Sequence, residues 1–248
     1  MHQNPQRGYR STMEPTGNIV PQHIGIILDG NRRFAKRLLL KPWKGHEWGA
    51  KKIEQLLSWC EEYGVHELTL YAFSVENFNR PKREFDYLMD LFFREFTRLK
   101  DDPRLLEKQI RITFIGRISM FPENIQQCMR DLMEKTKHFT KHLVNFAMAY
   151  GGRDEVVDAT KKIAAQVQDG KLAVEEINAS VFAENLYMND DVDLLIRTSE
   201  SRLSGFLPWQ TTYSEIIFLP DKLWPEFEKK DFAACIEEYQ RRQRRFGT

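Results

Sequence analysis

The chain has 248 residues, 42% of them hydrophobic, so it is long enough to bury a substantial core and short enough for one domain or two small ones. Its 37 lysines and arginines against 36 acidic residues give a formal net charge of +1, so no global positive field favours nucleic acid as a partner. Three scattered cysteines without a CxxC pair indicate reduced core cysteines and a cytoplasmic location, and no apolar run is long enough to predict a membrane span.

The order of the predicted elements indicates an α/β fold. Residues 1–18 are polar and contain proline and glycine, which predicts a flexible N-terminal tail before a single domain at 19–248. Strands are predicted at residues 23–28, 68–73, 110–115, 143–149, 193–196 and 215–218. Helical patterns begin at residue 34 and recur at 47–63, 83–100, 122–139, 154–168 and 231–245. Strands separated by helices predict a parallel sheet with helices on both faces.

The end of the first strand carries the most informative motif. The apolar run of residues 23–28 leads directly into Asp29, Gly30, Asn31 and Arg32-Arg33. Ligands of open α/β sheets bind at this end of the strands, where the following helix offers N–H groups to a phosphate. Glycine allows a close approach, arginine binds phosphate oxygens bidentately, and an aspartate fits a divalent cation shared with a diphosphate. The motif predicts metal-assisted diphosphate chemistry, with an ordinary turn capped by Asp29 as the alternative.

Three further strand ends also carry arginines beside small or amide residues. These arginines are Arg80, Arg153, and the pair Arg197 and Arg202. Because the carboxyl ends of parallel strands meet at one edge of a sheet, this repeated placement favours a site for two diphosphate groups.

The helix predicted at 83–100 has an unusually apolar face. Its large residues are Phe85, Leu88, Met89, Phe92, Phe93 and Phe96. Core packing is the simplest interpretation. Next to a cationic strand edge, the same face could line a hydrophobic tunnel, and an amphiphile with a diphosphate head and a hydrocarbon tail would suit both surfaces.

Several ordered segments across residues 21–247 resemble the cis-prenyltransferases, the family that includes undecaprenyl and dehydrodolichyl diphosphate synthases. They are HIGIILDGNRR, GHEWGA, LTLYAFSVENFNRP, AYGGRDE, DLLIRTSESRLSGFLPWQTTYSEIIF, LWPEF and RRFG. The resemblance implies the cis-prenyltransferase fold with its tunnel and a Mg²⁺-dependent reaction. That reaction joins an allylic prenyl diphosphate to a five-carbon isoprenoid diphosphate and releases diphosphate. A homodimer in the cytoplasm, with peripheral membrane contact for its lipid product, is also implied.

The resemblance further implies a role for each residue that matches a family motif. Asp29 and Glu215 would share the Mg²⁺ ion, and Ser74 and Asn77 would guide ionisation or proton loss. The allylic diphosphate would be bound by Gly30, Asn31, Arg32, Arg33, His46 and Arg80. The second diphosphate would be bound by Arg197, Arg202 and Ser204. The C-terminal Arg245-Phe246-Gly247 would reach into the partner subunit's site.

Two departures from the family pattern lie beside the first phosphate site. Arg32 stands where the family usually has glycine, which adds a positive charge there. Pro42 replaces an arginine that the family carries four residues before the histidine. The neighbouring Lys41 and Lys44 could supply a point charge but not a guanidinium fork.

A third departure lies in the motif of residues 197–204, which lacks one glycine of the family pattern. The shortening moves Arg202 and Ser204 relative to Arg197, so we expect an altered second-substrate site. That site would take dimethylallyl diphosphate as well as, or instead of, isopentenyl diphosphate and would give irregular linkages. A neutral loop variation is the simpler alternative.

A different class of function stays open, namely a subunit of a heteromeric polyprenyl diphosphate synthase with little activity alone. The retained Asp29 and Glu215 favour an active enzyme, whereas the shortened motif of residues 197–204 favours a partner subunit.

Overall fold

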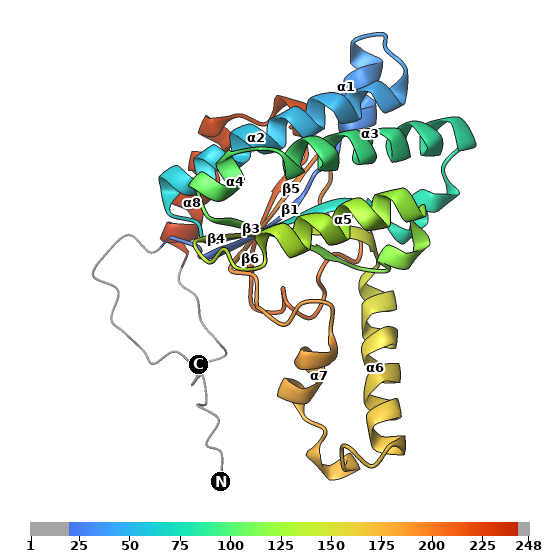
Figure 1. Cartoon of the computed structure of the whole chain (residues 1–248). Coiled ribbons are helices and arrows are strands. Elements are labelled where there is room, and N and C mark those ends of the chain that lie inside the picture. The colour runs from blue at the N-terminus through green and yellow to red at the C-terminus, as the bar shows by residue number, and fades with distance from the viewer. Residues whose placement is uncertain (1–19, 243–248) are drawn as a thin grey trace.

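Six parallel strands form the centre of the protein in a computed structural model that describes residues 20–242 (Figure 1). The sheet order is β3-β4-β2-β1-β5-β6, and every pairing is parallel. The strands are β1 (His23–Ile27), β2 (Glu67–Ser74), β3 (Ile110–Ile115), β4 (His142–Tyr150), β5 (Leu194–Thr198) and β6 (Glu215–Leu219). The predicted α/β class and all six predicted strands are confirmed.

Helices connect the strands. They are α1 (Asn31–Arg37), α2 (Gly45–Tyr63), α3 (Lys82–Lys100), α4 (Arg104–Glu107), α5 (Glu123–Thr136), α6 (Gly152–Gln168), α7 (Ala179–Asn185) and α8 (Lys229–Arg241). Short 3-10 helices are η1 (Pro42–Lys44), η2 (Val75–Asn79), η3 (Ile118–Met120), η4 (Val174–Glu176) and η5 (Trp224–Glu226). The sequence missed α4, α7 and the 3-10 helices because segments this short show too little periodicity. Within residues 20–242, no helix combines the length and apolarity needed to cross a membrane.

The two faces of the sheet are covered unequally. Helices α2, α3, α5 and α8 bury one face in the larger hydrophobic core. The other face packs against a smaller cluster that includes Phe206 and Leu207, while α6 and α7 extend away from the sheet on that side (Figure 1). The N-terminal tail predicted at residues 1–18 lies outside the described residues.

An irregularity at the end of β2 changes which way its side chains face. The register with β4 shifts between Tyr71 and Phe73, and again before Ser74. Residues two apart on a regular strand face the same side. Here Tyr71 stacks on Phe206 across one face, whereas Phe73 packs against Phe92 of α3 on the other. The bulge thereby turns Phe73 toward α3, as bulges beside functional sites often do.

Candidate active site

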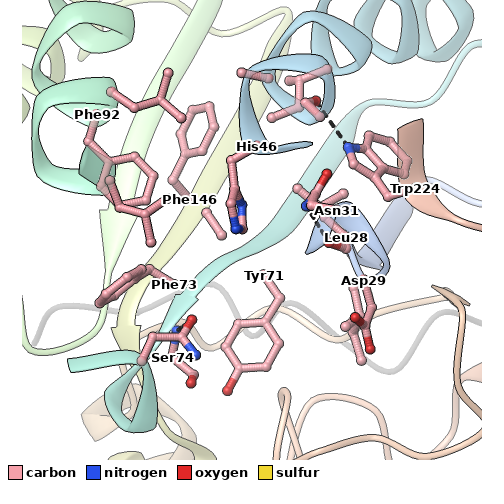
Figure 2. Close-up of a pocket in the computed structure, with 18 of the residues that line it drawn as sticks. Leu28, Asp29, Asn31, His46, Tyr71, Phe73, Ser74, Phe92, Phe146 and Trp224 are labelled. Carbon is pink, nitrogen blue, oxygen red and sulfur yellow. Dashed lines mark hydrogen bonds between the residues drawn. The ribbon is translucent and has the colours of Figure 1, made fainter. Parts of the chain in front are cut away.

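A cavity of about 910 Å³ opens at the carboxyl ends of β1, β2 and β5. This volume is near the upper end of the range for small-molecule sites. Its apolar walls come from α3 and the sheet, with Leu88, Phe92 and Phe96 facing Phe73 and Phe146. Figure 2 shows the three aromatic residues Phe73, Phe92 and Phe146 on one side, with polar groups across from them. The predicted hydrophobic tunnel is therefore present.

Only part of the apolar face predicted on α3 lines this cavity. Leu88, Phe92 and Phe96 do, and Leu91 joins them. Met89 is buried in the core, whereas Phe93 is 42% exposed to solvent. Leu88, Leu91 and Phe96 also belong to the hydrophobic core, so the core and cavity interpretations of this helix hold for the same residues.

The turn after β1 holds Asp29 at the polar mouth of the cavity. Gly30 has a φ of 108°, a left-handed conformation that glycine adopts readily. Its N–H donates to Asp29 Oδ1 at 2.6 Å, and Arg197 Nη2 lies 3.0 Å from Oδ2. Arg33 Nη2 is 3.6 Å from Oδ1. The side chain is 34% exposed, so the carboxylate keeps unused lone pairs on the cavity side.

Arg197 at the end of β5 is almost fully buried and is held by its terminal nitrogens. Besides Asp29, it donates to Ser204 Oγ at 2.6 Å and to the carbonyl of Arg202. Its Nε is buried and has no hydrogen-bond partner among the described residues. A buried guanidinium with an unused N–H beside a cavity is suited to bind an anionic oxygen, because an unpaired donor there is costly.

Glu200 lies between two cavity-lining arginines. Its carboxylate is 3.1 Å from Arg33 and 2.6 Å from Arg202. Arg33 also donates to the carbonyl of Ser199 at 3.1 Å. The carboxylate of Glu200 thus pairs with guanidinium groups that an incoming diphosphate could also bind.

Two further cavity-lining arginines, Arg32 and Arg80, lie near His46. Arg80 Nη1 lies 3.4 Å from His46 Nε2, and Glu84 pairs with Arg80 at 2.5 Å and with Arg32 at 3.5 Å. Burial, followed by the positive charges of Arg80 and Arg32, lowers the pKa of His46 to about 3. The imidazole is therefore neutral at physiological pH. It can donate a hydrogen bond to a phosphate, or accept one from it, without adding positive charge to the site.

Ser74 and Asn77 lie together where β2 meets η2. The side-chain oxygen of Asn77 accepts a hydrogen bond from the backbone N–H of Ser74 at 3.2 Å. Both residues line the cavity. Ser74 lies next to Phe73, where the polar mouth meets the apolar wall (Figure 2).

The structure brings most of the predicted site residues together. The cavity lining includes Asp29, Gly30, Asn31, Arg32, Arg33, His46, Ser74, Asn77, Arg80, Arg197, Arg202 and Ser204. Arg153, also predicted at a strand end, is exposed at the start of α6 and is not part of this lining. Arg245 and Gly247 lie outside the described residues.

Glu215 does not line this cavity, because it stands at the start of β6 whereas Asp29 follows the end of β1. The metal that it would share with Asp29 stays a prediction. Glu215 begins β6 and pairs in register with Leu194, which pairs with Ile24 of β1. Ile24 lies near the start of β1, whereas Asp29 follows the end of that strand at Ile27. Glu215 instead pairs with Arg242 at 2.9 Å. In a parallel sheet, a residue at the start of one strand and a residue after the end of another lie at opposite edges. The sequence motifs around Glu215 and Asp29 do not by themselves show this separation.

Trp224 is a site residue to which the sequence assigned no functional role. Its backbone N–H donates to the carbonyl of Asp29 at 2.9 Å, and its Nε1 donates to the carbonyl of Gly49 at 3.0 Å (Figure 2). It also lines the cavity. Trp224 thereby ties the turn after β1 to α2, and its place in the LWPEF segment was the available signal.

The donor set fits Mg²⁺ shared with a substrate rather than a metal held by protein alone. Among residues 20–242, no group of three or more histidine, cysteine or acidic side chains is arranged to hold a metal ion. Mg²⁺ is commonly held by one or two carboxylates together with substrate phosphates and water. Asp29 provides one carboxylate at a cationic mouth, which matches that pattern.

The chain is similar to proteins named as isoprenoid diphosphate synthases and isoprenyl transferases. A family model described as "Putative undecaprenyl diphosphate synthase" matches residues 27–247. The tritrans,polycis-undecaprenyl-diphosphate synthase (geranylgeranyl-diphosphate specific) of Methanopyrus kandleri is 44% identical over 231 residues, covering 92% of this chain and 85% of that protein. An isoprenyl transferase of Thermus thermophilus is 44% identical over 235 residues, covering 92% and 89%. Among solved structures, lavandulyl diphosphate synthase from Lavandula x intermedia, in complex with dimethylallyl diphosphate, has a TM-score of 0.88 at 34% identity and covers 92% of this chain and 99% of that one.

Proposed function

Because the chain belongs to the undecaprenyl diphosphate synthase family of cis-prenyltransferases, we propose that it joins an allylic prenyl diphosphate to a five-carbon isoprenoid diphosphate and releases diphosphate. The observation that carries this proposal is the cavity of about 910 Å³, which has an arginine-rich mouth and phenylalanine-rich walls. Its two surfaces suit the two ends of a prenyl diphosphate.

The polar mouth offers one group of side chains to each diphosphate. Arg33, His46 and Arg80 would bind the diphosphate of the allylic substrate, near the N-terminus of α1. Arg197, Arg202 and Ser204, which all line the cavity, would bind the second diphosphate. Glu200 would give up its arginine partners as the phosphates bind. These guanidinium groups would stabilise negative charge as it grows on the leaving group.

Asp29 would hold Mg²⁺ together with the substrate diphosphate, and the bound ion would neutralise charge on the departing group. The aromatic walls keep water away from the allylic cation that forms when the carbon–oxygen bond breaks. Ser74 and Asn77, at the junction of the polar and apolar surfaces, would position the reacting carbons and the proton that leaves.

The test uses the purified chain alone, a labelled allylic primer, a five-carbon diphosphate and Mg²⁺. We expect labelled products of greater chain length, loss of at least a hundredfold in kcat for Asp29→Asn, and retention of activity in Lys82→Ala, a surface control. Activity that appears only after adding a homologous subunit would favour the heteromeric alternative. No product under either condition would overturn the proposal.

We infer that the acceptor site is altered by its shortened loop. Two residues other than glycine have left-handed backbones in it, Ser199 (φ 71°) and Ser204 (φ 49°), and Leu207 (φ 47°) follows three residues later. Such conformations are uncommon and costly outside glycine, as expected when a shorter segment must connect the same anchors. The similarity to lavandulyl diphosphate synthase, whose crystals contain dimethylallyl diphosphate, supports an allylic acceptor here.

The acceptor is tested by supplying isopentenyl and dimethylallyl diphosphate separately. We expect turnover with dimethylallyl diphosphate alone, and branched or irregular products by mass spectrometry and NMR. Inserting one glycine after Ser199 restores the family's spacing and should shift preference toward isopentenyl diphosphate. Strict dependence of the unaltered chain on isopentenyl diphosphate would refute the altered acceptor while leaving the general function intact.

We also propose a cytoplasmic homodimer. The edge strand β6 is only partly buried along its length, and the nearby Trp209 and Tyr213 are 37% and 64% exposed. An edge strand with exposed aromatic neighbours is a common protein interface. Light scattering of the purified chain tests this: a monomer at micromolar concentration would refute it.

A further inference from the structure

Three consecutive leucines form the most exposed apolar segment near the cavity mouth. Leu38, Leu39 and Leu40 are 47%, 96% and 42% exposed, and we call them the leucine loop. They connect α1 to η1, and this connection forms the projecting blue loop at the top of the molecule in Figure 1. Single exposed leucines are ordinary, but a run of three at a protruding tip indicates a contact surface.

The loop has a defined backbone that presents these side chains outward. The N–H groups of Leu38, Leu39 and Leu40 donate to carbonyls of α1 at 2.9–3.2 Å. Leu39 has a φ of 57°, a left-handed conformation that is rare for leucine. A left-handed and almost fully exposed leucine is unfavourable in water. Such strained positions are typical of functional surfaces, where a contact with an apolar partner would bury the side chain.

Positive charge and an aromatic ring flank the leucine loop. Lys36 and Lys41 on its two sides are exposed, and neither forms an ion pair with another residue in the range 20–242. Trp48 of α2 is 50% exposed and packs edge-on against Phe34 of α1, with ring centroids 5.7 Å apart. Leucines between free lysines, with a tryptophan nearby, match the pattern of surfaces that insert into the boundary of an anionic bilayer.

We propose that the leucine loop docks the protein on a lipid bilayer that carries anionic headgroups. The leucines would enter the acyl boundary, and Lys36 and Lys41 would contact the headgroups. Charge complementarity selects this partner over a second copy of the chain, because copies of the loop would bring like charges together.

The position of the loop connects docking to the cavity. Arg33 and Lys36 on α1 line the cavity, and Lys36 is only two residues from Leu38. Docking would hold the cavity mouth beside the lipid phase, where a polyprenyl product could leave without crossing water. This advantage rests on the proposed prenyl transfer, whereas the docking itself does not.

Flotation with vesicles tests the proposal on the full chain. The probes are phosphatidylcholine vesicles with and without roughly 30% phosphatidylglycerol. This fraction of anionic lipid is similar to that of natural anionic membranes. We expect binding to the anionic vesicles, reduced at least tenfold in the triple variant Leu38→Asn, Leu39→Asn, Leu40→Asn. Asparagine tolerates the left-handed position, so the turn should persist. Leu106→Asn, at a 63% exposed leucine on α4, is the matched control and should bind like the unaltered chain.

A charge variant separates the two parts of the contact. Lys41→Glu should weaken binding to anionic vesicles by about thirtyfold, because removing one charge and adding the opposite one changes the attraction by two charges at about 1 kcal/mol each. Binding to neutral vesicles should be unaffected. Prenyl transfer measured in detergent with a short primer should be unchanged in the triple variant.

Three results would overturn docking: no flotation of the unaltered chain, equal flotation of the triple variant, or a change in oligomeric mass caused by that variant. The last would identify the loop as a contact between copies. Absence of prenyl transfer in every variant would instead count against the proposed function, so the two failures are distinguishable.

Discussion

Replacement of Gly30 by alanine should damage the turn that holds Asp29. A Cβ at this position would lie 2.3 Å from Ser199 Oγ and 3.0 Å from the Cα of Leu223. Ser199 Oγ lies 3.1 Å from the carbonyl of Asp29 and 3.2 Å from that of Lys222. Relief of the clash therefore requires Ser199 to move and to lose a hydrogen bond that anchors the turn.

The expected cost has two parts. A left-handed φ of 108° costs alanine about 1–2 kcal/mol relative to glycine. The lost hydrogen bond and the close approach to the backbone of Leu223 add about 1–2 kcal/mol. We therefore expect Gly30→Ala to lower the free energy of unfolding by about 2–4 kcal/mol and to reduce kcat more than a uniform loss of folded protein would.

Gly64→Ala is the matched control, because Gly64 also has a left-handed φ of 73° but has no atom within 4 Å of the added Cβ. Only the conformational cost of about 1 kcal/mol should remain there. Urea denaturation measures both variants. In the double variant with Ser199→Ala, the cost should be less than the sum of the single costs, since the clashing Oγ is gone. Equal destabilisation by Gly30→Ala and Gly64→Ala, or strict additivity of the double variant, would refute this reasoning.

Three further changes test other parts of the structure. Burial raises the pKa of Glu67 to about 7, so between about pH 4.5 and 7 the folded state keeps a proton that the unfolded state releases. Glu67→Gln should therefore stabilise the protein by about 2 kcal/mol at pH 8 and leave its stability at pH 4 unchanged. Equal effects at both pH values in urea titrations would contradict this. His46 has a lowered pKa of about 3, so the unfolded state binds the extra proton and stability should fall as pH drops from 6.5 toward 3; His46→Gln should flatten that slope, and an unaltered slope would count against a neutral buried imidazole. Leu99 lines both the main cavity and a smaller one at its far end, whereas Leu91 lines the main cavity alone. Leu99→Ala should lengthen the products and cost about 2 kcal/mol of stability, and Leu91→Ala should not lengthen them. Chromatography measures the product length and thermal unfolding measures the stability.

Local motifs made much of the fold and site predictable. Alternation of apolar runs and helical patterns specified six strands and their connections, because side-chain periodicity is set by backbone geometry. Asp29, Gly30 and Arg33 are consecutive or nearly so, and a strand-to-helix junction keeps such residues at one sheet edge. The tunnel wall on α3 was visible for the same reason, since helical periodicity places Leu88, Phe92 and Phe96 on neighbouring turns.

Distances between segments far apart in the chain were decided only by tertiary structure. Glu200 contacts Arg33 across more than 160 residues, and Glu215 lies at the opposite end of the sheet from Asp29. The β2 bulge, which turns Phe73 toward α3, depends on pairing with β4. No local pattern encodes these outcomes, because each depends on register between strands and on the packing of several elements at once.

The sequence by itself determined the α/β order of elements, the presence of a carboxylate among arginines after β1, and the apolar helix face. The tertiary structure decided which arginines share a carboxylate, which phenylalanines face the cavity, and that His46 is neutral. The physical reason is that covalent spacing controls periodicity and nearest neighbours, whereas desolvation and long-range charge pairing exist only once separate segments have packed together.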